Sequence, residues 1–396
     1  MQKYIQLSIL QTLQFLVWGT WFVTAGTYML QSLHFSGREV GFVYATTSLS
    51  ATISPLVLGV IADRFISVER LLSILHFVGA ILLYWLSQIN EFNLFLSVMM
   101  AYMICYLPTF SLTSSYCFHH IKDVKNDFPK IRVWGTIAWI IAGILVSYLD
   151  IEDTSVPFVI ACGFSLLLSV YCLFLPVTPI AQKSPLTKKT LFGPELLTLF
   201  KAKSFSILII ALGLICIPLS FYYSFVNPFL NEVGIANAAG KMSIGQMAEI
   251  IVMLSLPWFF KNLNFKIMIF IGLLAWGVRY GLFAYGFNHN LEWIIIVGIA
   301  LHGIAYVFSM LSAQIYIDTI VPNHLRSTAQ GFFTLITMGI MALIGTFIAG
   351  ELVNTYTYSN ATHNWAAIWQ FPFWFGIVVS IVFLFLFKSD RQPDQL

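Results

Sequence analysis

The fold is decided by a polar stretch in the middle of the chain, which reads PIAQKSPLTKKTLFGPELLTLFKAK from Pro179 to Lys203. A helix needs about 20 mostly apolar residues to cross a bilayer. Six stretches of that kind precede the polar stretch and six follow it. They lie near residues 5–30, 40–62, 71–88, 93–118, 130–149, 155–177, 204–230, 242–260, 265–286, 292–318, 327–352 and 365–387. We therefore expect an all-α polytopic membrane protein with twelve transmembrane helices.

The composition of the chain excludes most classes of soluble protein. Of its 396 residues, 59% are hydrophobic and only 9% are charged, whereas about a quarter of the residues of a soluble domain are charged. So few charges cannot cover the surface of a cytosolic enzyme, a nucleic-acid-binding protein or a disordered scaffold. The five cysteines lie in apolar stretches without the spacing of metal ligands, so we expect no disulfide, no metal site and no cofactor.

The positions of the basic residues predict the orientation in the membrane. If both termini are cytoplasmic, the cytoplasmic segments contain 17 of the 20 Lys and Arg residues. The outer loops then contain only Arg38 and Lys241, and Arg279 lies within a span. Because basic residues concentrate on the cytoplasmic side, this distribution supports both the number of spans and their direction. We expect a multi-pass protein of the cell inner membrane, with both termini in the cytoplasm.

Two sets of six spans joined by a basic cytoplasmic loop are typical of the major facilitator architecture, in which two six-helix halves rock around a central site. We expect an N-terminal bundle over residues 1–177, a central loop over 178–203 and a C-terminal bundle over 204–396. The loops between the spans are too short to hold a soluble catalytic domain. The protein is therefore expected to be a transporter and not an enzyme.

A short motif in the loop between the second and third spans supports this architecture. It reads Gly59-Val-Ile-Ala-Asp63-Arg64 and resembles the GxxxDR core found at this loop in major facilitator proteins. Asp63 can cap a helix or pair across the cytoplasmic gate, and Arg64 can bind a carboxylate or a helix C-terminus. Asp318 and Arg326 flank a short turn at the inner end of the tenth span. We expect these four charged residues to act in gating.

The eighth predicted span contains a carboxylate, Glu249, within an apolar stretch. Gln246 precedes it by three residues, so both side chains project from one helix face. That face has to meet the bundle or a cavity, because lipid cannot solvate it. A buried carboxylate can bind and release a proton near neutral pH, and it can accept hydrogen bonds from a hydroxyl group. We expect Glu249 to bind substrate and couple transport to protons; a structural hydrogen bond between helices is the alternative.

Two further spans contain an arginine. Arg132, Thr136 and Trp139 lie at i, i+4 and i+7 on one stripe of the fifth span, which suits a polar ligand with a flat ring. As an alternative, Arg132 extends to the membrane interface. Arg279, in the ninth span, is expected to have a structural role as the partner of a carboxylate or of helix carbonyls. Glu249 is one candidate for that carboxylate.

Other polar side chains within spans are candidate substrate-binding residues. They are Gln14 in the first span, Ser220, Tyr223 and Asn227 in the seventh, and His302 and Tyr306 in the tenth. His302 and Tyr306 lie at i, i+4 and therefore share a helix face. For this pair, lining a cavity and packing in the core remain alternatives.

Five segments, in order along the chain, resemble the bacterial nucleoside:proton symporters of the major facilitator superfamily. They are 13–21, 127–136, 246–249, 279–286 and 326–331, and the runs FPKIRVWGT and RSTAQG within them are the most specific. The resemblance implies nucleoside uptake driven by the proton gradient. It also implies that the nucleoside is contacted by Arg132, Thr136, Trp139, Gln246 and Glu249. Trp139 stands where the family has phenylalanine, so a ring is retained and enlarged.

Other positions differ from the family pattern. Ser220 and Tyr223 align with a glutamine and an asparagine of the family, His302 aligns with a tyrosine, and Val307 stands where an acid follows the aromatic residue of the tenth helix. Glu249 is then the main acid in mid-membrane. We expect import of nucleosides by proton symport through alternating access, by a monomer and without a nucleic-acid partner. The alternative is transport of another polar solute, as in a sugar or polyol symporter or a drug exporter.

Overall fold

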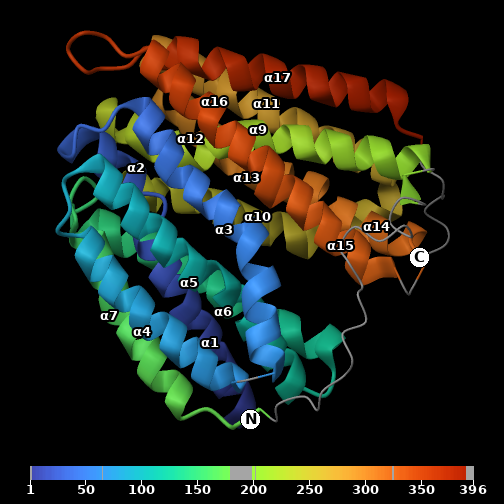
Figure 1. Cartoon of the computed structure of the whole chain (residues 1–396). Helices are drawn as coiled ribbons and strands as arrows, with labels where there is room; N and C mark the ends of the chain where they lie inside the picture. Colours follow the sequence, from blue (N-terminus) through green and yellow to red (C-terminus); the bar gives the residue numbers. More distant parts are fainter. Residues whose placement is uncertain (1, 65, 179–198, 201, 323–324, 389–396) are drawn as a thin grey trace. The chain divides into compact units, whose positions relative to one another are not determined.

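The computed structural model describes residues 2–64, 66–178, 199–200, 202–322 and 325–388, and at 2, 53–64, 124–126 and 327 it describes the backbone alone (Figure 1). The described residues are almost entirely helical, and their one strand-like pairing is a bridge between Thr357 and His363. Eleven helices among them are long and apolar enough to cross a membrane. The helix α3 (Gly37–Arg64) covers the remaining predicted span. The predicted all-α fold with twelve transmembrane helices is confirmed.

The chain forms two compact units. The first contains Met1–Thr187 and Ala236–Ser243, and the second contains Lys188–Ile235 and Ile244–Leu396. The short second segment of the first unit begins a helix whose backbone is held by side chains of that unit. The N–H of Ala239 donates to Glu152 at 2.9 Å, and the N–H of Gly240 donates to Ser147 at 2.7 Å. The predicted central loop, 178–203, lies almost entirely outside the described residues.

The first unit contains six spans. Its elements are α1 (Gln2–Trp21), α2 (Ala25–Thr27), the π-helix η1 (Tyr28–Ser32), α3, α4 (Val68–Leu86), α5 (Phe92–His120), α6 (Val124–Tyr148) and α7 (Val156–Leu173). α1 packs against α6 and α7, and α4 packs against α5 and α7. A Cβ added to Gly19 of α1 would lie only 3.1 Å from the Cα of Trp139 in α6. Small residues allow such close packing where lipid provides no hydrophobic driving force.

The second unit contains two spans that are interrupted. Its continuous helices are α9 (Lys203–Glu232), α10 (Ala238–Asn262, whose first turns belong to the first unit), α11 (Phe265–Asn288) and α17 (Trp365–Leu386). The tenth span consists of α12 (Glu292–Ala300), α13 (His302–Tyr306), the π-helix η2 (Val307–Leu311) and α14 (Ser312–Ile320). The eleventh consists of α15 (Arg326–Thr334), the π-helix η4 (Leu335–Met341) and α16 (Ala342–Thr355). Irregular turns of this kind are frequent at functional sites.

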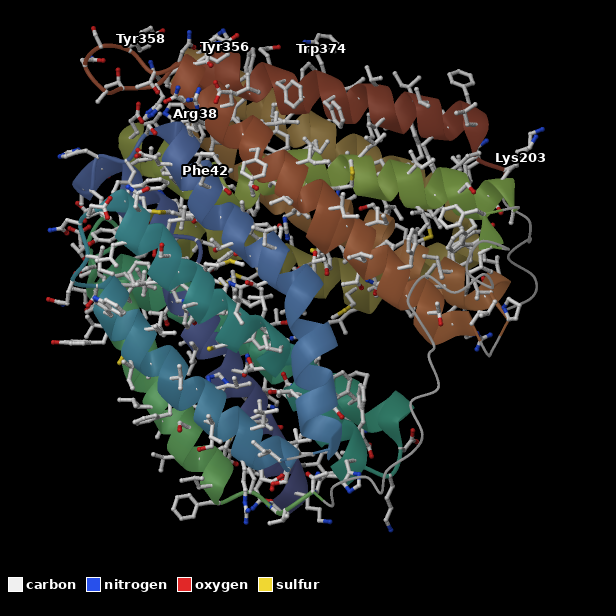
Figure 2. The ribbon with its side chains drawn as sticks, viewed as in Figure 1. Arg38, Phe42, Lys203, Tyr356, Tyr358 and Trp374 are labelled. Carbon is white, nitrogen blue, oxygen red and sulfur yellow. The ribbon has the colours of Figure 1, made fainter. Side chains whose placement is uncertain are left out.

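The surface of the second unit is apolar along its length and polar at its ends. Figure 2 shows Lys203 at one end of the unit and Tyr356 and Tyr358 at the opposite end, as the order of the spans requires. Trp374 points away from the bundle, and Leu254 and Phe385 are also exposed. Large apolar side chains exposed in such numbers mark a surface that contacts lipid.

Candidate functional site

In the first unit, Arg132 and Trp139 lie along the face of α6 that meets the aromatic side chains of α1. The guanidinium carbon of Arg132 lies 4.2 Å from the centroid of the Phe15 ring. The Trp139 ring lies 5.9 Å from that of Trp18, in edge-to-face geometry. Cation–π and edge-to-face contacts fix the orientation of such groups. Because Arg132, Thr136 and Trp139 are all partly exposed, the stripe is accessible as well as ordered.

A glycine leaves room for this arrangement. A Cβ added to Gly135 would lie 2.6 Å from the Phe15 ring and 2.9 Å from Nη1 of Arg132. Any larger residue at position 135 would displace one of these two side chains. The glycine of the FPKIRVWGT run therefore places the arginine of the same run against α1.

Gln14 lies in a separate, fully buried network of the first unit. Its side-chain N–H donates to Oγ1 of Thr109 at 2.7 Å, and its carbonyl oxygen lies 3.0 Å from Nε2 of His76. Nδ1 of His76 lies 3.3 Å from the hydroxyl of Ser165. Because both ends of its amide are bonded inside the bundle, Gln14 joins α1 to α4 and α5. The structure does not bring Gln14 to the accessible stripe of Arg132 and Trp139.

In the second unit, Glu249 of α10 faces His302 of α13. Their nearest atoms, Oε2 of Glu249 and Nε2 of His302, are 3.9 Å apart. The side chain of Glu249 is 23% exposed, whereas that of His302 is only 1% exposed. Gln246, one helical turn before Glu249, is largely buried. The carboxylate is thus accessible, and the imidazole lies buried behind it.

Close packing of glycines places these two residues together. A Cβ added to Gly303 would lie 2.4 Å from the carbonyl carbon of Ala248, and one added to Gly245 would lie 3.0 Å from the Cβ of His302. The tenth span also breaks at Leu301, directly before His302. Interrupted helices commonly form the binding sites of transporters. The break and the close approach together position His302 beside the carboxylate.

Arg279 of α11 lies on the other side of His302. Its Nη1 is 3.2 Å from Nδ1 of His302, and its guanidinium carbon lies 3.9 Å from the centroid of the Tyr222 ring and 5.2 Å from that of Trp276. Arg279 is 0% exposed, and its Nε and Nη2 have no hydrogen-bond partner among the described residues. The structure therefore pairs Arg279 with an imidazole and aromatic rings, and Glu249 lies beyond that imidazole.

Three tyrosines surround His302. Tyr222 and Tyr306 stack on its ring with centroid distances of 5.0 Å and 6.0 Å, and Tyr223 approaches edge-to-face at 6.4 Å. Tyr222 is buried, whereas Tyr223 and Tyr306 are partly exposed. Tyr223 also interacts electrostatically with Glu249. The structure thus brings Tyr223 and Tyr306 to the same cluster as the accessible carboxylate.

The two other candidates of the seventh span, Ser220 and Asn227, are buried and hydrogen-bonded within the second unit. The hydroxyl of Ser220 lies 3.0 Å from the carbonyl of Cys216 and 3.1 Å from that of Ala342, which links α9 to α16. Asn227 is fully buried, and its side-chain oxygen accepts a hydrogen bond from Asn231 at 3.3 Å. The structure does not bring Ser220 or Asn227 to the accessible cluster around Glu249.

The predicted gating residues lie at helix ends. Oδ1 of Asp318 accepts a hydrogen bond from Nε2 of Gln330 at 2.8 Å, which links α14 to α15. Arg326 is exposed at the start of α15. Asp63 and Arg64 lie in the last turn of α3, and their side chains lie outside the described residues. A gating role for these four residues stays a prediction.

Sequence reasoning missed two aromatic residues that hold the cluster. Trp276 donates its indole N–H to Ser309 at 3.1 Å and meets His302 edge-to-face at 5.5 Å. Trp276 and Arg279 are spaced i, i+3 on α11, a spacing that indicates one packed face. Tyr222 carries no comparable signal, because it is one aromatic residue among many in this chain.

Comparisons with known proteins identify the family. The family model described as "Nucleoside H+ symporter" matches residues 1–392. The chain is 37% identical to the "Putative nucleoside transporter YegT" of Escherichia coli (strain K12), with 99% of this chain and 96% of that protein covered. It is 30% identical to the xanthosine permease of the same strain, with 99% and 97% covered.

A solved structure agrees with the match of the family model. The crystal structure of nucleoside transporter NupG is 30% identical in sequence and superposes with a TM-score of 0.90, covering 98% of this chain and 100% of that one. The resemblance predicted from the five sequence segments is confirmed. The chain belongs to the nucleoside H+ symporter family of the major facilitator superfamily.

Proposed function

We propose that this protein imports nucleosides by proton symport through alternating access. The observation that carries the proposal is Glu249, a partly exposed carboxylate within a membrane span of a chain that belongs to the nucleoside H+ symporter family. The protein acts as a monomer in the inner membrane, with both termini in the cytoplasm. The concentration of Lys and Arg residues in the segments on that side supports this orientation.

We assign the nucleoside contacts to partly exposed residues of each unit and to Gln246, which is largely buried one helical turn before Glu249. The first unit supplies Trp139, whose ring suits the base, with Arg132 and Thr136 as hydrogen-bonding groups on the same stripe. Binding sites of this kind combine apolar rings with a few well-placed polar groups. The edge-to-face contact of Trp139 with Trp18 supports this role, because it orients the ring before substrate arrives.

The second unit supplies Tyr306 as a further ring and Gln246 and Glu249 as hydrogen-bonding groups. Glu249 can accept hydrogen bonds from the hydroxyl groups of the ribose. Tyr223 borders the same cluster and is a further contact. We assign structural roles to Gln14, Ser220 and Asn227, because each is buried and bonded to its own bundle.

Glu249 carries the coupling proton in this proposal. Moving a charged carboxylate into a closed state without water is costly, and protonation removes that charge. Uptake of a proton from outside therefore favours closure around the bound nucleoside. Release of the proton to the cytoplasm restores the carboxylate after the nucleoside has left.

Purified protein in liposomes tests the proposal directly. With an imposed gradient, acidic outside, we expect labelled uridine to accumulate above its outside concentration, and a protonophore should collapse the accumulation. Liposomes without protein control for leakage. Equal uptake with and without the gradient would contradict proton symport.

A competition experiment separates nucleosides from the alternative solutes. Unlabelled nucleosides should reduce the uptake of labelled uridine, whereas free bases, sugars and polyols should not. Competition by sugars or polyols, with none by nucleosides, would favour the other kind of symporter instead.

A further inference from the structure

We propose that His302 and Arg279 form an electrostatic relay behind the carboxylate of Glu249. The relay passes no proton itself, and it sets the pH at which the transporter takes up its proton. The inference rests on the proposed coupling role of Glu249. Because His302 and Arg279 are 1% and 0% exposed, neither contacts the substrate. His302 is a positioning residue that orients an N–H toward Glu249, and Arg279 fixes His302 in that orientation.

The hydrogen bond between Arg279 and His302 determines which nitrogen carries the proton. A guanidinium group can only donate hydrogen bonds and stays charged in proteins. Nδ1 of His302, 3.2 Å from Nη1 of Arg279, must therefore be the acceptor and carries no proton. The proton of the neutral ring is then on Nε2, because the bond at one ring nitrogen sets the tautomer. Nε2 is the nitrogen that faces Oε2 of Glu249 at 3.9 Å.

The same geometry keeps His302 from carrying the transported proton. A doubly protonated imidazole would turn a second N–H toward the N–H of Arg279 and bring two positive charges together in a buried place. Both effects are unfavourable. The group that can exchange a proton is Glu249, which is also the accessible member of the three.

Arg279 supplies the positive charge of the relay. It is fully buried, and two of its nitrogens have no hydrogen-bond partner among the described residues. The face of Tyr222, 3.9 Å away, compensates the charge only in part. A deprotonated Glu249 beyond the imidazole is therefore favourable for Arg279, and protonation of Glu249 removes that counter-charge.

The other ionisable groups around the relay are phenols. They are Tyr222 and Tyr223 on α9, Tyr280 on α11 and Tyr306 on α13. Tyr222 and Tyr223 also interact electrostatically with Glu249. Among the described residues that contact these groups, Glu249 is the acid, so the relay acts on that carboxylate.

The test compares His302→Phe with His302→Gln by measuring uridine uptake into liposomes as a function of outside pH. Phenylalanine keeps a ring to stack on Tyr222 and Tyr306 but has no nitrogen. Glutamine can accept from Arg279 with its carbonyl oxygen and donate to Glu249 with its amide. We expect the pH of half-maximal uptake to rise by about 1 unit in His302→Phe, because a carboxylate that loses the positive end of a nearby N–H dipole stays protonated to higher pH. His302→Gln should return it toward wild type.

His76→Phe is the matched control, because His76 is equally buried but is bonded to the neutral residues Gln14 and Ser165. We expect this variant to yield less folded protein while its pH of half-maximal uptake stays unchanged. An unchanged pH profile in His302→Phe, or an equal shift in His76→Phe, overturns the relay.

A second variant keeps the test valid if His302→Phe does not fold. Removing the acceptor of a buried charged group is destabilising, whereas replacing both partners by apolar groups is tolerated better. The double variant His302→Phe/Arg279→Met removes the charge together with its acceptor. A monodisperse preparation of it should show a shift in the same direction, and larger, because the positive charge is gone. A wild-type pH profile in this double variant also overturns the relay.

The variant Glu249→Gln separates the relay from the proposed function. In that background no acid is left for the relay to act on, so adding His302→Phe should not change the pH profile of uridine exchange. Gradient-driven uptake retained by Glu249→Gln alone means that the coupling assignment fails. Loss of that uptake, with a wild-type pH profile in His302→Phe, means that only the relay fails.

Discussion

Among the described residues of the spans, each unit buries one histidine, and the partners of the two histidines differ in charge. His76 in the first unit is bonded to Gln14 and Ser165, both neutral. His302 in the second unit lies between the guanidinium of Arg279 and the carboxylate of Glu249. Both rings are about 1% exposed, so burial does not distinguish them.

If His302 acts as proposed, the charge of its partners is what distinguishes it from His76, whose partners are neutral. A neutral, satisfied network such as that of His76 fixes helices in place and responds little to a proton. An imidazole between a cation and an acid is part of a cluster of interacting ionisable side chains. The electrostatic energy of such a cluster changes when one member binds a proton, and clusters of this kind concentrate at functional sites.

The largest expected effect is that of Glu249→Gln, which removes the carboxyl group that faces His302 and, beyond it, Arg279 in the second unit. For one proton per nucleoside, wild-type protein can accumulate substrate by about tenfold per pH unit of gradient, because each tenfold ratio corresponds to about 1.4 kcal/mol. The variant should accumulate none and should equilibrate substrate at best. Liposome uptake with a 2-unit gradient, about a hundredfold for wild type, measures this. Concentrative uptake at the wild-type level would show that Glu249 does not couple transport to protons.

Gly303→Ala tests the close packing that brings His302 to Glu249. The added Cβ would lie 2.4 Å from a backbone carbon of Ala248, so we expect a loss of about 2–3 kcal/mol in the stability of the fold. Gly163→Ala is the matched control, because nothing lies within 4 Å of its added Cβ. It should be neutral or more stable by about 0.5–1 kcal/mol. Thermal unfolding in detergent measures both variants, and equal melting temperatures would refute the packing argument.

Gln14→Leu tests the neutral network of the first unit. It removes the acceptor of the His76 N–H and one donor to the Thr109 hydroxyl oxygen, which costs about 1–2 kcal/mol for buried groups. We expect a lower melting temperature and an unchanged pH of half-maximal uptake. A shifted pH profile would show that the first unit also takes part in proton coupling, and the contrast between the two histidines would then fail.

The smallest effect is expected at an acid outside the membrane. Glu91 caps the N-terminus of α5, and the backbone N–H groups of Leu94 and then Asn93 hold the pKa of its carboxyl below the usual value. Because the folded-state pKa is the lower one, the stabilisation is present above the usual value near 4.5 and is lost as pH falls through the folded pKa. Glu91→Gln should flatten the acid side of the melting-temperature profile slightly. An unchanged profile would show that the cap adds nothing to stability.

Sequence alone predicted the positions of the spans well, but it predicted neither their exact ends nor the interruptions of the tenth and eleventh spans. Apolar length identified all twelve spans, but α6 begins at Val124 and α10 at Ala238, ahead of the predicted 130 and 242. Helices continue past the bilayer where polar residues can still be solvated, and Asp127 in the first turn of α6 favours such a start. Hydropathy marks the membrane segment and therefore underestimates the helix.

The candidate site was predictable in part. The spacing of Arg132, Thr136 and Trp139 placed them on one stripe, and the structure leaves all three accessible. The polar residues of the seventh span do not share one environment. Tyr223 borders the cluster around Glu249, whereas Ser220 contacts α16. Spacing along a helix predicts which side chains share a face. It does not predict which neighbouring helix that face meets.

The amino-acid sequence was sufficient to predict the membrane class, the number of spans, the family and the acid within the eighth span. Each of these follows from local properties, namely apolar length, charge position and short motifs. The pairing of Arg279 with His302, and the bonding of Gln14 away from the accessible stripe, became visible in the folded structure. The physical reason is that a buried charge is partnered by whatever the packing of distant helices brings near, and here glycines such as Gly303 set that approach.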